Sequence, residues 1–203
     1  MPTGVALHDP RAQLLAAGQR VLLREGPGGL TSRSVTEEAE VSKGVLHRHF
    51  DTFDDFLVEL VRERRAAVDA LMDALQDRSG AGTVVGNLVG TVTELFGPLG
   101  LAVVRLLLTR DGLSARLRGQ AHGVPVLVEA VAGIRAYLVS EQAVGRIVPD
   151  ASADALAHAL VGTCHLLFAG ELGGLPDESA VRECVESIVV GAERGPTEAA
   201  RSV

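Results

Sequence analysis

Apolar residues recur at helical spacing along almost the whole of this 203-residue chain, and this periodicity restricts the fold more than any other feature of the sequence. Between residues 11 and 24, for example, Leu14, Leu15, Val21 and Leu22 fall on one stripe of a helix. No apolar segment alternates with the period of about two residues that marks a half-buried strand. Aromatic residues make up only 3% of the chain and Trp is absent, so Leu, Val and Ala must fill the core, which favours helix packing. The sequence therefore predicts an all-α fold.

Glycine and proline runs divide the chain into helix-length pieces. The run from Glu25 to Gly29 ends the first helix, because Gly adopts left-handed conformations and Pro cannot continue a helix. Thr31 and Ser42 each stand where a side-chain oxygen can cap the start of a short helix. We expect the first ten residues to form a disordered arm and residues 195–203 to form a frayed tail. Helices are predicted over residues 11–24, 32–39, 43–49, 53–78, 83–96, 98–109, 112–121, 123–143, 151–169 and 177–193.

The charged residues are unevenly distributed. A net charge of −7 is unfavourable for a nucleic-acid binder, but binding to phosphates depends on where the cations lie. Residues 1–65 carry 9 basic and 10 acidic side chains, a net of −1, whereas residues 66–203 carry 10 and 16, a net of −6. The only lysine of the chain, Lys43, lies in a segment, residues 42–50, that contains no acid. This segment is the best candidate for contact with an anionic partner.

Residues 31–50 have the form of a helix-turn-helix, with two short polar helices joined by a tight turn. In the second of these helices Val45, Leu46 and the following Phe50 are predicted to face inward. The predicted outward positions carry groups that can reach phosphates or base edges. Spacing alone leaves DNA binding and a purely structural helical corner both open. The predicted outward residues are Lys43, Gly44, His47 and Arg48.

The segment from Leu30 to Leu57, LTSRSVTEEAEVSKGVLHRHFDTFDDFL, resembles the amino-terminal domain of the TetR family of transcriptional regulators. The shared features are the threonine that opens helix two, the Val-Ser turn, the Gly-x-Leu of the recognition helix and the His-Phe that closes it. A long fourth helix then begins directly, and the first helix ends at Gly26, as the family pattern requires.

The resemblance implies a ligand-responsive homodimer whose recognition helices enter successive major grooves, about 34 to 36 Å apart, on a palindromic double-stranded DNA operator. It also implies that ligand binding changes this spacing. By position in the motif, it assigns DNA contacts to Thr31, Ser32 and Arg33 in helix two, and to Ser42, Lys43, Gly44, Val45, His47, Arg48 and His49 in and just before the recognition helix.

Three positions depart from the family pattern. Glu40 replaces the usual turn glycine, His47 the usual phosphate-binding tyrosine, and Phe53 the usual lysine at the start of helix four. A lost lysine and a gained acid both weaken the attraction to phosphates, so we expect modest DNA affinity that falls steeply with salt. Phe53 is expected to pack under the motif instead. The two other acids of the motif, Glu37 and Glu38, are expected to face solvent.

Residues 11–55 are predicted to form the helix-turn-helix DNA-binding domain, and residues 56–195 a helical ligand-binding and dimerisation domain. The helices near 151–169 and 177–193 are expected to pair with those of a second copy in a four-helix bundle. The pocket is expected to have aliphatic walls and to bind a small apolar or amphipathic ligand. Its candidate residues are Phe96, Arg105, His122, Tyr137, His165 and Phe168.

Two alternatives to a ligand-responsive repressor remain open. One is a helical dimeric sensor or interaction protein that has lost DNA binding, which the three departures and the acidic total favour. The other is an enzyme, but no phosphate-binding glycine loop, HExxH motif or Ser/His/Asp arrangement is present. We therefore expect no catalytic activity and no cofactor.

Metal binding and export are not expected either. His47 and His49 lie two residues apart and would point in different directions on a helix, which makes a poor metal pair. Cys164 and Cys184 form no CxxC motif and are expected to be buried free thiols. No signal peptide or membrane-spanning apolar run is evident, so we expect a soluble cytoplasmic protein that does not bind a membrane.

Overall fold

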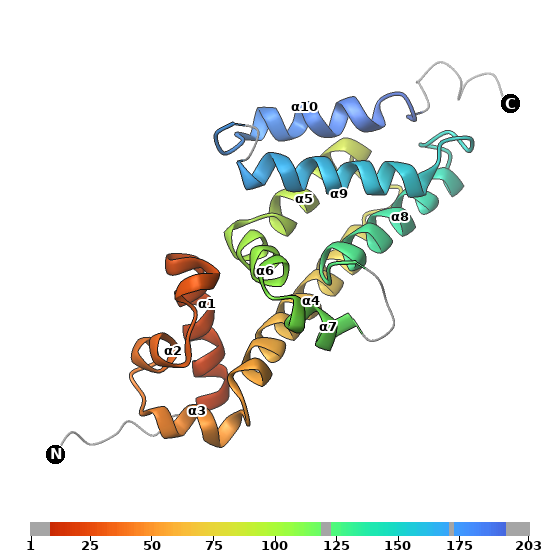
Figure 1. Ribbon diagram of the computed structural model, residues 1–203. Helices are drawn as coiled ribbons and strands as arrows, with labels where there is room; N and C mark the ends of the chain where they lie inside the picture. The colour runs from red at the N-terminus through yellow and green to blue at the C-terminus, as the bar shows by residue number, and fades with distance from the viewer. Residues whose placement is uncertain (1–8, 119–122, 171–172, 194–203) are drawn as a thin grey trace, which may run out of the picture. The chain divides into compact units, whose positions relative to one another are not determined.

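The computed structural model describes residues 9–118, 123–170 and 173–193, and within these ranges it contains ten helices and no strand (Figure 1). The predicted all-α class is confirmed. The helices are α1 Pro10–Gly29, α2 Ser32–Glu38, α3 Lys43–His49, α4 Phe53–Gln76, α5 Val84–Leu95, α6 Pro98–Thr109, α7 Asp111–Arg118, α8 Leu127–Ala143, α9 Ala153–Ala169 and α10 Glu178–Val189.

The helices form two compact units. The first contains Met1–Arg64 and Ala102–Val124, and the second contains Arg65–Leu101 and Pro125–Val203. The long helix α4 and the helix α6 each contribute residues to both units. The predicted division into functional domains after residue 55 stays a prediction.

In the first unit, α1, α2, α3 and the start of α4 surround a small apolar core (Figure 1). Leu14, Leu22, Leu46 and Phe56 are almost completely buried in it. Gly18 allows α1 to approach α4 closely, because a Cβ at this position would lie 2.5 Å from the ring of Phe56. The short helices α2 and α3, which are too short to be stable alone, are therefore held by tertiary packing.

In the second unit, α9 packs between α8 and α10, and α10 also packs against α5. The core contains fully buried Leu88, Ile134, Leu160 and Val185, one from each of these four helices. Oxygen-bearing side chains cap three of the helices: Thr83 accepts from Gly86 N, Ser152 from Ala155 N, and Asp177 from Ala180 N.

Several expectations need correction or fall outside the described residues. The predicted end of the first helix is visible as a kink, since Gly26 has a φ of +70° although helical turns resume through Gly29. The eighth helix begins at Leu127, four residues later than predicted. The predicted arm lies largely, and the tail entirely, outside the described residues, as does the end of the helix predicted over 112–121.

In the described part of the chain, no single helix is long and apolar enough to cross a membrane. Only α5 and α6 taken together, as a bent pair, reach that length and apolarity.

Candidate nucleic-acid interface

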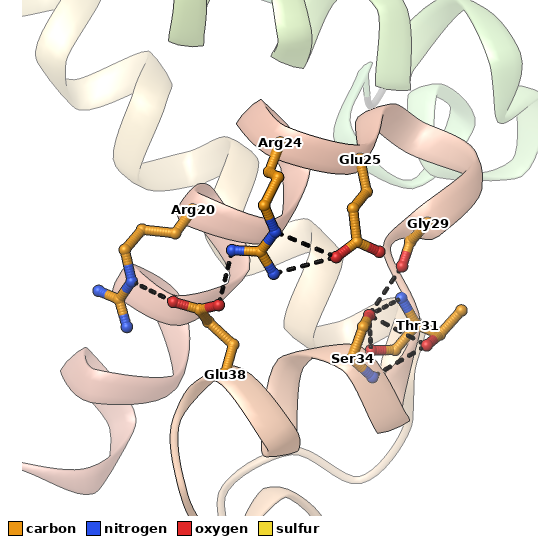
Figure 2. A network of polar contacts seen from close by, with 7 residues as sticks. All are labelled: Arg20, Arg24, Glu25, Gly29, Thr31, Ser34 and Glu38. Atoms are coloured by element: carbon orange, nitrogen blue, oxygen red, sulfur yellow. Dashed lines mark hydrogen bonds and ion pairs between the residues drawn. The ribbon is translucent and has the colours of Figure 1, made fainter.

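A reciprocal pair of hydrogen bonds fixes the start of α2 (Figure 2). The backbone N–H of Ser34 donates to Thr31 Oγ1 at 3.1 Å, and the backbone N–H of Thr31 donates to Ser34 Oγ at 2.9 Å. Ser34 Oγ also lies 2.7 Å from the carbonyl oxygen of Gly29, which ties the cap to the end of α1. Thr31 is exposed, so the hydroxyl assigned to DNA contact also holds the helix that presents it.

Two arginines of α1 hold the far end of α2 (Figure 2). Glu38 accepts from Arg20 Nε at 2.7 Å and from Arg24 Nη1 at 2.8 Å, and Arg24 also pairs with Glu25 at 3.0 Å. The hydrogen bonds from Arg20 and Arg24 hold the pKa of Glu38 below its ordinary value. Glu38, which was expected to face solvent, is half-buried, because Arg20 and Arg24, four residues apart on α1, reach it.

Helix α3, the predicted recognition helix, is anchored on one face and exposed on the other. Leu46 is fully buried and Val45 half-buried, so one edge of α3 packs into the first unit. Ser42 is the N-cap residue, as predicted, but its side chain makes no capping hydrogen bond. Four cationic or polar side chains of α3 are exposed and make no hydrogen bond or ion pair with any described residue. They are Lys43, His47, Arg48 and His49.

The remaining residues assigned to helix two are less open to a partner. Ser32 is half-buried, whereas Arg33 is exposed and pairs through Nε with Glu37 at 2.7 Å, one turn along the helix. This hydrogen bond raises the pKa of Arg33 above its ordinary value. An exposed pair of this kind is weak, so Arg33 can exchange Glu37 for a phosphate at little cost.

The turn between α2 and α3 contains a non-glycine residue in the left-handed region. Glu40 has a φ of +54°, a conformation that Gly adopts without strain and other residues adopt at a cost of about 1–2 kcal/mol. Its backbone N–H donates to Glu37 O at 3.1 Å and that of Val41 to Thr36 O at 3.0 Å, which closes the turn. The substitution at position 40 therefore keeps the turn but adds strain and an acid to it.

Aromatic packing supports the end of α3. Phe53 stacks on Phe56 with ring centroids 5.4 Å apart, and Phe50 meets the same ring edge-on at 5.2 Å. Arg11 lies over the ring of Phe50 at 5.3 Å. The residue that replaces the family's usual lysine at position 53 thus packs beneath the motif.

Three of the predicted ligand residues lie close together in the second unit. Phe96 lies 5.8 Å from His165 and 6.0 Å from Phe168, measured between ring centroids. Phe168 also lines a groove of about 420 Å³ between α5 and the start of α10, together with Val89 and Val181. Arg105 belongs to the first compact unit, and His122 lies outside the described residues.

Tyr137 belongs to a buried polar network that sequence reasoning missed. Its hydroxyl accepts from Asn87 Nδ2 at 3.0 Å and contacts Glu141, and burial raises the pKa of Tyr137 to about 12. Arg146 donates through Nε to the fully buried Glu141 at 2.6 Å, and Gly80 N donates to the same carboxylate at 3.3 Å. Burial raises the pKa of Glu141, but the bonds from Arg146 and Tyr137 outweigh it and keep that pKa below its ordinary value.

This network ties the end of α8 to the loop before α5 within the second unit. The sequence signal was a lone acid near the end of an apolar helix with an arginine five residues later. Among the described residues, no group of three or more His, Cys, Asp or Glu side chains is arranged to hold a metal ion.

The fold defines an all-helical protein with an amino-terminal helix-turn-helix. Residues 14–60 match the family model described as "Bacterial regulatory proteins, tetR family". These residues contain α2, α3 and parts of α1 and α4, and the match confirms the resemblance to the TetR family that the sequence of this segment indicated.

Solved structures resemble the chain over most of its length. A TetR-family member from Streptomyces coelicolor A3 is 26% identical, with a TM-score of 0.63 over 89% of this chain and 98% of that chain. The multidrug binding protein EbrR, in complex with imidazole, is 28% identical, with a TM-score of 0.59 over 89% of this chain and 95% of that chain. A TetR-family regulator from Agrobacterium tumefaciens, at 16% identity and a TM-score of 0.71 over 91% and 98% of the two chains, shows the likeness of fold alone. No curated protein matches the chain by sequence.

Proposed function

We propose that this TetR-family regulator is a repressor that binds a palindromic operator as a homodimer and responds to a small apolar or amphipathic ligand. The proposal rests on the exposure of the side chains of α3 and on their lack of partners among the described residues. Its cations Lys43 and Arg48 are exposed and without a partner among the described residues, while Leu46 anchors the helix in the core. A helical corner with only a structural role would need the buried Leu46 but would not need Lys43 and Arg48.

The residues of the motif have separate roles in this proposal. Lys43 and Arg48 neutralise phosphates or donate to guanine edges, and His47 and His49 donate to phosphate oxygens. Gly44 and Val45 allow the helix to approach the groove closely. Thr31, Ser32, Arg33 and Ser42 contact the DNA backbone from α2 and from the turn.

The second copy is proposed to pack on α9 and α10. The exposed side of α9 carries small residues at helical spacing, Ala155, Ala159 and Gly162, followed by Leu166, which is 42% exposed. Small side chains on one face let two helices approach closely in a bundle. Val190, the residue that follows α10, is also 62% exposed.

Ligand sensing is proposed for the second unit. The cluster of Phe96, His165 and Phe168 adjoins the apolar groove that Phe168 lines. EbrR, the 28% identical neighbour, is described as a multidrug binding protein and has been solved with imidazole, malachite green and ethidium. Val89, Phe168 and Val181 give the groove an apolar wall, and Glu94, Asp177 and Glu178 also line it, which suits amphipathic as well as apolar ligands.

Fluorescence anisotropy with DNA from immediately upstream of the protein's own gene, across a salt series, tests the DNA-binding part. We expect selective binding that Lys43→Ala/Arg48→Ala weakens at least tenfold, with a salt slope smaller by about two. The control Arg62→Ala/Arg135→Ala removes the same charge from exposed sites outside α3 and should bind as the parent does. If both variants lose equal affinity, or the parent binds only as it binds random DNA, the alternative of a helical sensor without DNA binding is favoured.

A further inference from the structure

We propose that Arg110 and Arg116 are positioning residues that hold the helix-turn-helix in its DNA-binding arrangement through the carboxylates at the start of α4. The inference rests on the proposed function and extends it to two residues outside the motif. Asp54, Asp55, Arg110 and Arg116 all belong to the first compact unit. We call these four residues the clamp.

The clamp includes contacts with the segment that directly follows α3. Thr52 and Asp55 form a reciprocal cap between α3 and α4: Asp55 N donates to Thr52 Oγ1 at 3.1 Å and Thr52 N donates to Asp55 Oδ2 at 3.0 Å. The other oxygen of Asp55 accepts from Arg116 Nη2, and Arg116 Nη1 lies 3.9 Å from Asp54. The hydrogen bonds from the Thr52 hydroxyl and from Arg116 hold the pKa of Asp55 below its ordinary value.

The clamp also reaches the entry to the motif. Nη1 of Arg110 lies 4.0 Å from Asp54 Oδ1, and Nη2 of Arg110 donates to the carbonyl oxygen of Leu30 at 3.5 Å. Leu30 is fully buried and directly precedes Thr31, the N-cap of α2. Two arginines from one short segment therefore contact the chain both just before α2 and just after α3.

That segment is itself firmly attached. Leu113 is 4% exposed, and the buried hydroxyl of Ser114 donates to Leu107 O of α6 at 2.8 Å. The backbone N–H of Leu113 donates to the backbone carbonyl oxygen of Arg110 at 2.9 Å, which closes the turn between α6 and α7.

The clamp also cancels charge that would oppose DNA. Asp54 and Asp55 follow α3 by five and six residues and carry negative charge close to its cations along the chain. Paired with arginines, they repel phosphates less. Arg110 and Arg116 thus act through the carboxylates, and neither has to touch DNA.

A mutant cycle in DNA binding tests this assignment. Arg116→Ala should weaken operator binding about fivefold to tenfold, and the same change in an Asp54→Asn/Asp55→Asn background should weaken it less than twofold. The salt slope should fall by clearly less than one for Arg116→Ala, because only the salt-screened repulsion from Asp54 and Asp55 is added and no phosphate contact is lost, whereas Lys43→Ala should lower it by about one. Equal losses in the two backgrounds with a slope lowered by about one would mean that Arg116 contacts phosphate directly and would overturn the proposal.

Hydrogen exchange separates failure of the clamp from failure of the proposed function. Amides of residues 42–53 should exchange faster in Arg116→Ala than in the parent, while the control Arg135→Ala leaves them unchanged. If the amides of residues 42–53 exchange in Arg116→Ala as they do in the parent, the clamp is refuted even if the parent binds DNA. If they exchange faster, the clamp is supported even if the parent does not bind DNA. If Arg116→Ala unfolds the protein, Arg116→Lys is measured instead. It keeps the charge but loses the two-pronged contact, so it should still exchange faster and bind DNA more weakly than the parent; parent-like values in both readouts would refute the clamp.

Discussion

Replacing Glu40 by glycine is expected to stabilise the protein and to strengthen DNA binding together. Glu40 holds a φ of +54° in the turn between α2 and α3 and is exposed, so its side chain contributes no burial that would offset the strain. Relief of a left-handed conformation is worth about 1–2 kcal/mol. Glycine also has greater conformational freedom in the unfolded chain, which reduces the gain in the free energy of unfolding by about 0.4–1 kcal/mol.

The net gain is therefore about 0–1.6 kcal/mol with a midpoint of about 0.8 kcal/mol, and for a chain of this size the midpoint raises Tm by roughly 2–3 °C. The lost acid adds a separate effect, because the turn leads directly into the cations of α3 and an anion there repels phosphates. We expect operator affinity at low salt to rise by about twofold to fivefold, and less at high salt, where the repulsion is screened.

Thermal unfolding and anisotropy of Glu40→Gly, measured beside Glu40→Gln, separate the two effects. Glutamine removes the charge but keeps the strain, so it should share the gain in affinity and not the gain in Tm. A lower Tm for Glu40→Gly than for Glu40→Gln would refute the strain argument. Equal DNA affinities for all three proteins would refute the electrostatic one.

Three further predictions concern the two cores. Gly18→Ala places a methyl group against an aromatic ring at 2.5 Å and should destabilise the protein by about 1–3 kcal/mol, measured by urea unfolding; an unchanged midpoint would contradict the close approach. Arg146→Ala leaves Glu141 buried without its main partner and should cost roughly 2–3 kcal/mol at pH 7, less than a fully buried pair because Arg146 is 27% exposed. Because the pKa of Glu141 is lower in the folded than in the unfolded parent, Glu141 contributes stability above its unfolded pKa, and this contribution is lost as the pH falls through its folded pKa. A parent whose free energy of unfolding does not fall on acidification, and equals that of the variant, would contradict this pairing. Burial and the neighbouring Cys184 raise the pKa of Cys164 to about 12, so iodoacetamide at pH 8 should leave Cys164 unmodified in the folded protein and modify it in guanidinium, as read by mass spectrometry.

Local signals in the sequence were sufficient for the helices. Thr31 and Ser42 stand at the two helix starts of the motif, and the apolar stripe on α1 follows directly from residue spacing. The helix-turn-helix could be recognised because its turn, caps and anchors lie within about twenty consecutive residues. Such short-range patterns depend little on the rest of the fold.

Long-range contacts were beyond the reach of the sequence. The Arg20–Glu38 pair and the hydrogen bond between Asn87 and Tyr137 depend on how helices pack, which spacing does not specify. Pocket residues were hardest to predict, because an aromatic in an apolar helix gives the same pattern whether it fills a core or lines a cavity. Tyr137 illustrates this: it was expected to contact a ligand, and its hydroxyl is engaged by Asn87.

Selection of binding sites from a pool of random double-stranded DNA tests the central claim most directly. It works wherever in the genome the operator lies. The account predicts enrichment of an inverted repeat whose half-sites are spaced by about one helical turn or a multiple of it, with Lys43→Ala/Arg48→Ala failing to enrich it. Enrichment of no sequence by the parent, or of the same sequence by that variant, would contradict the claim that α3 reads DNA.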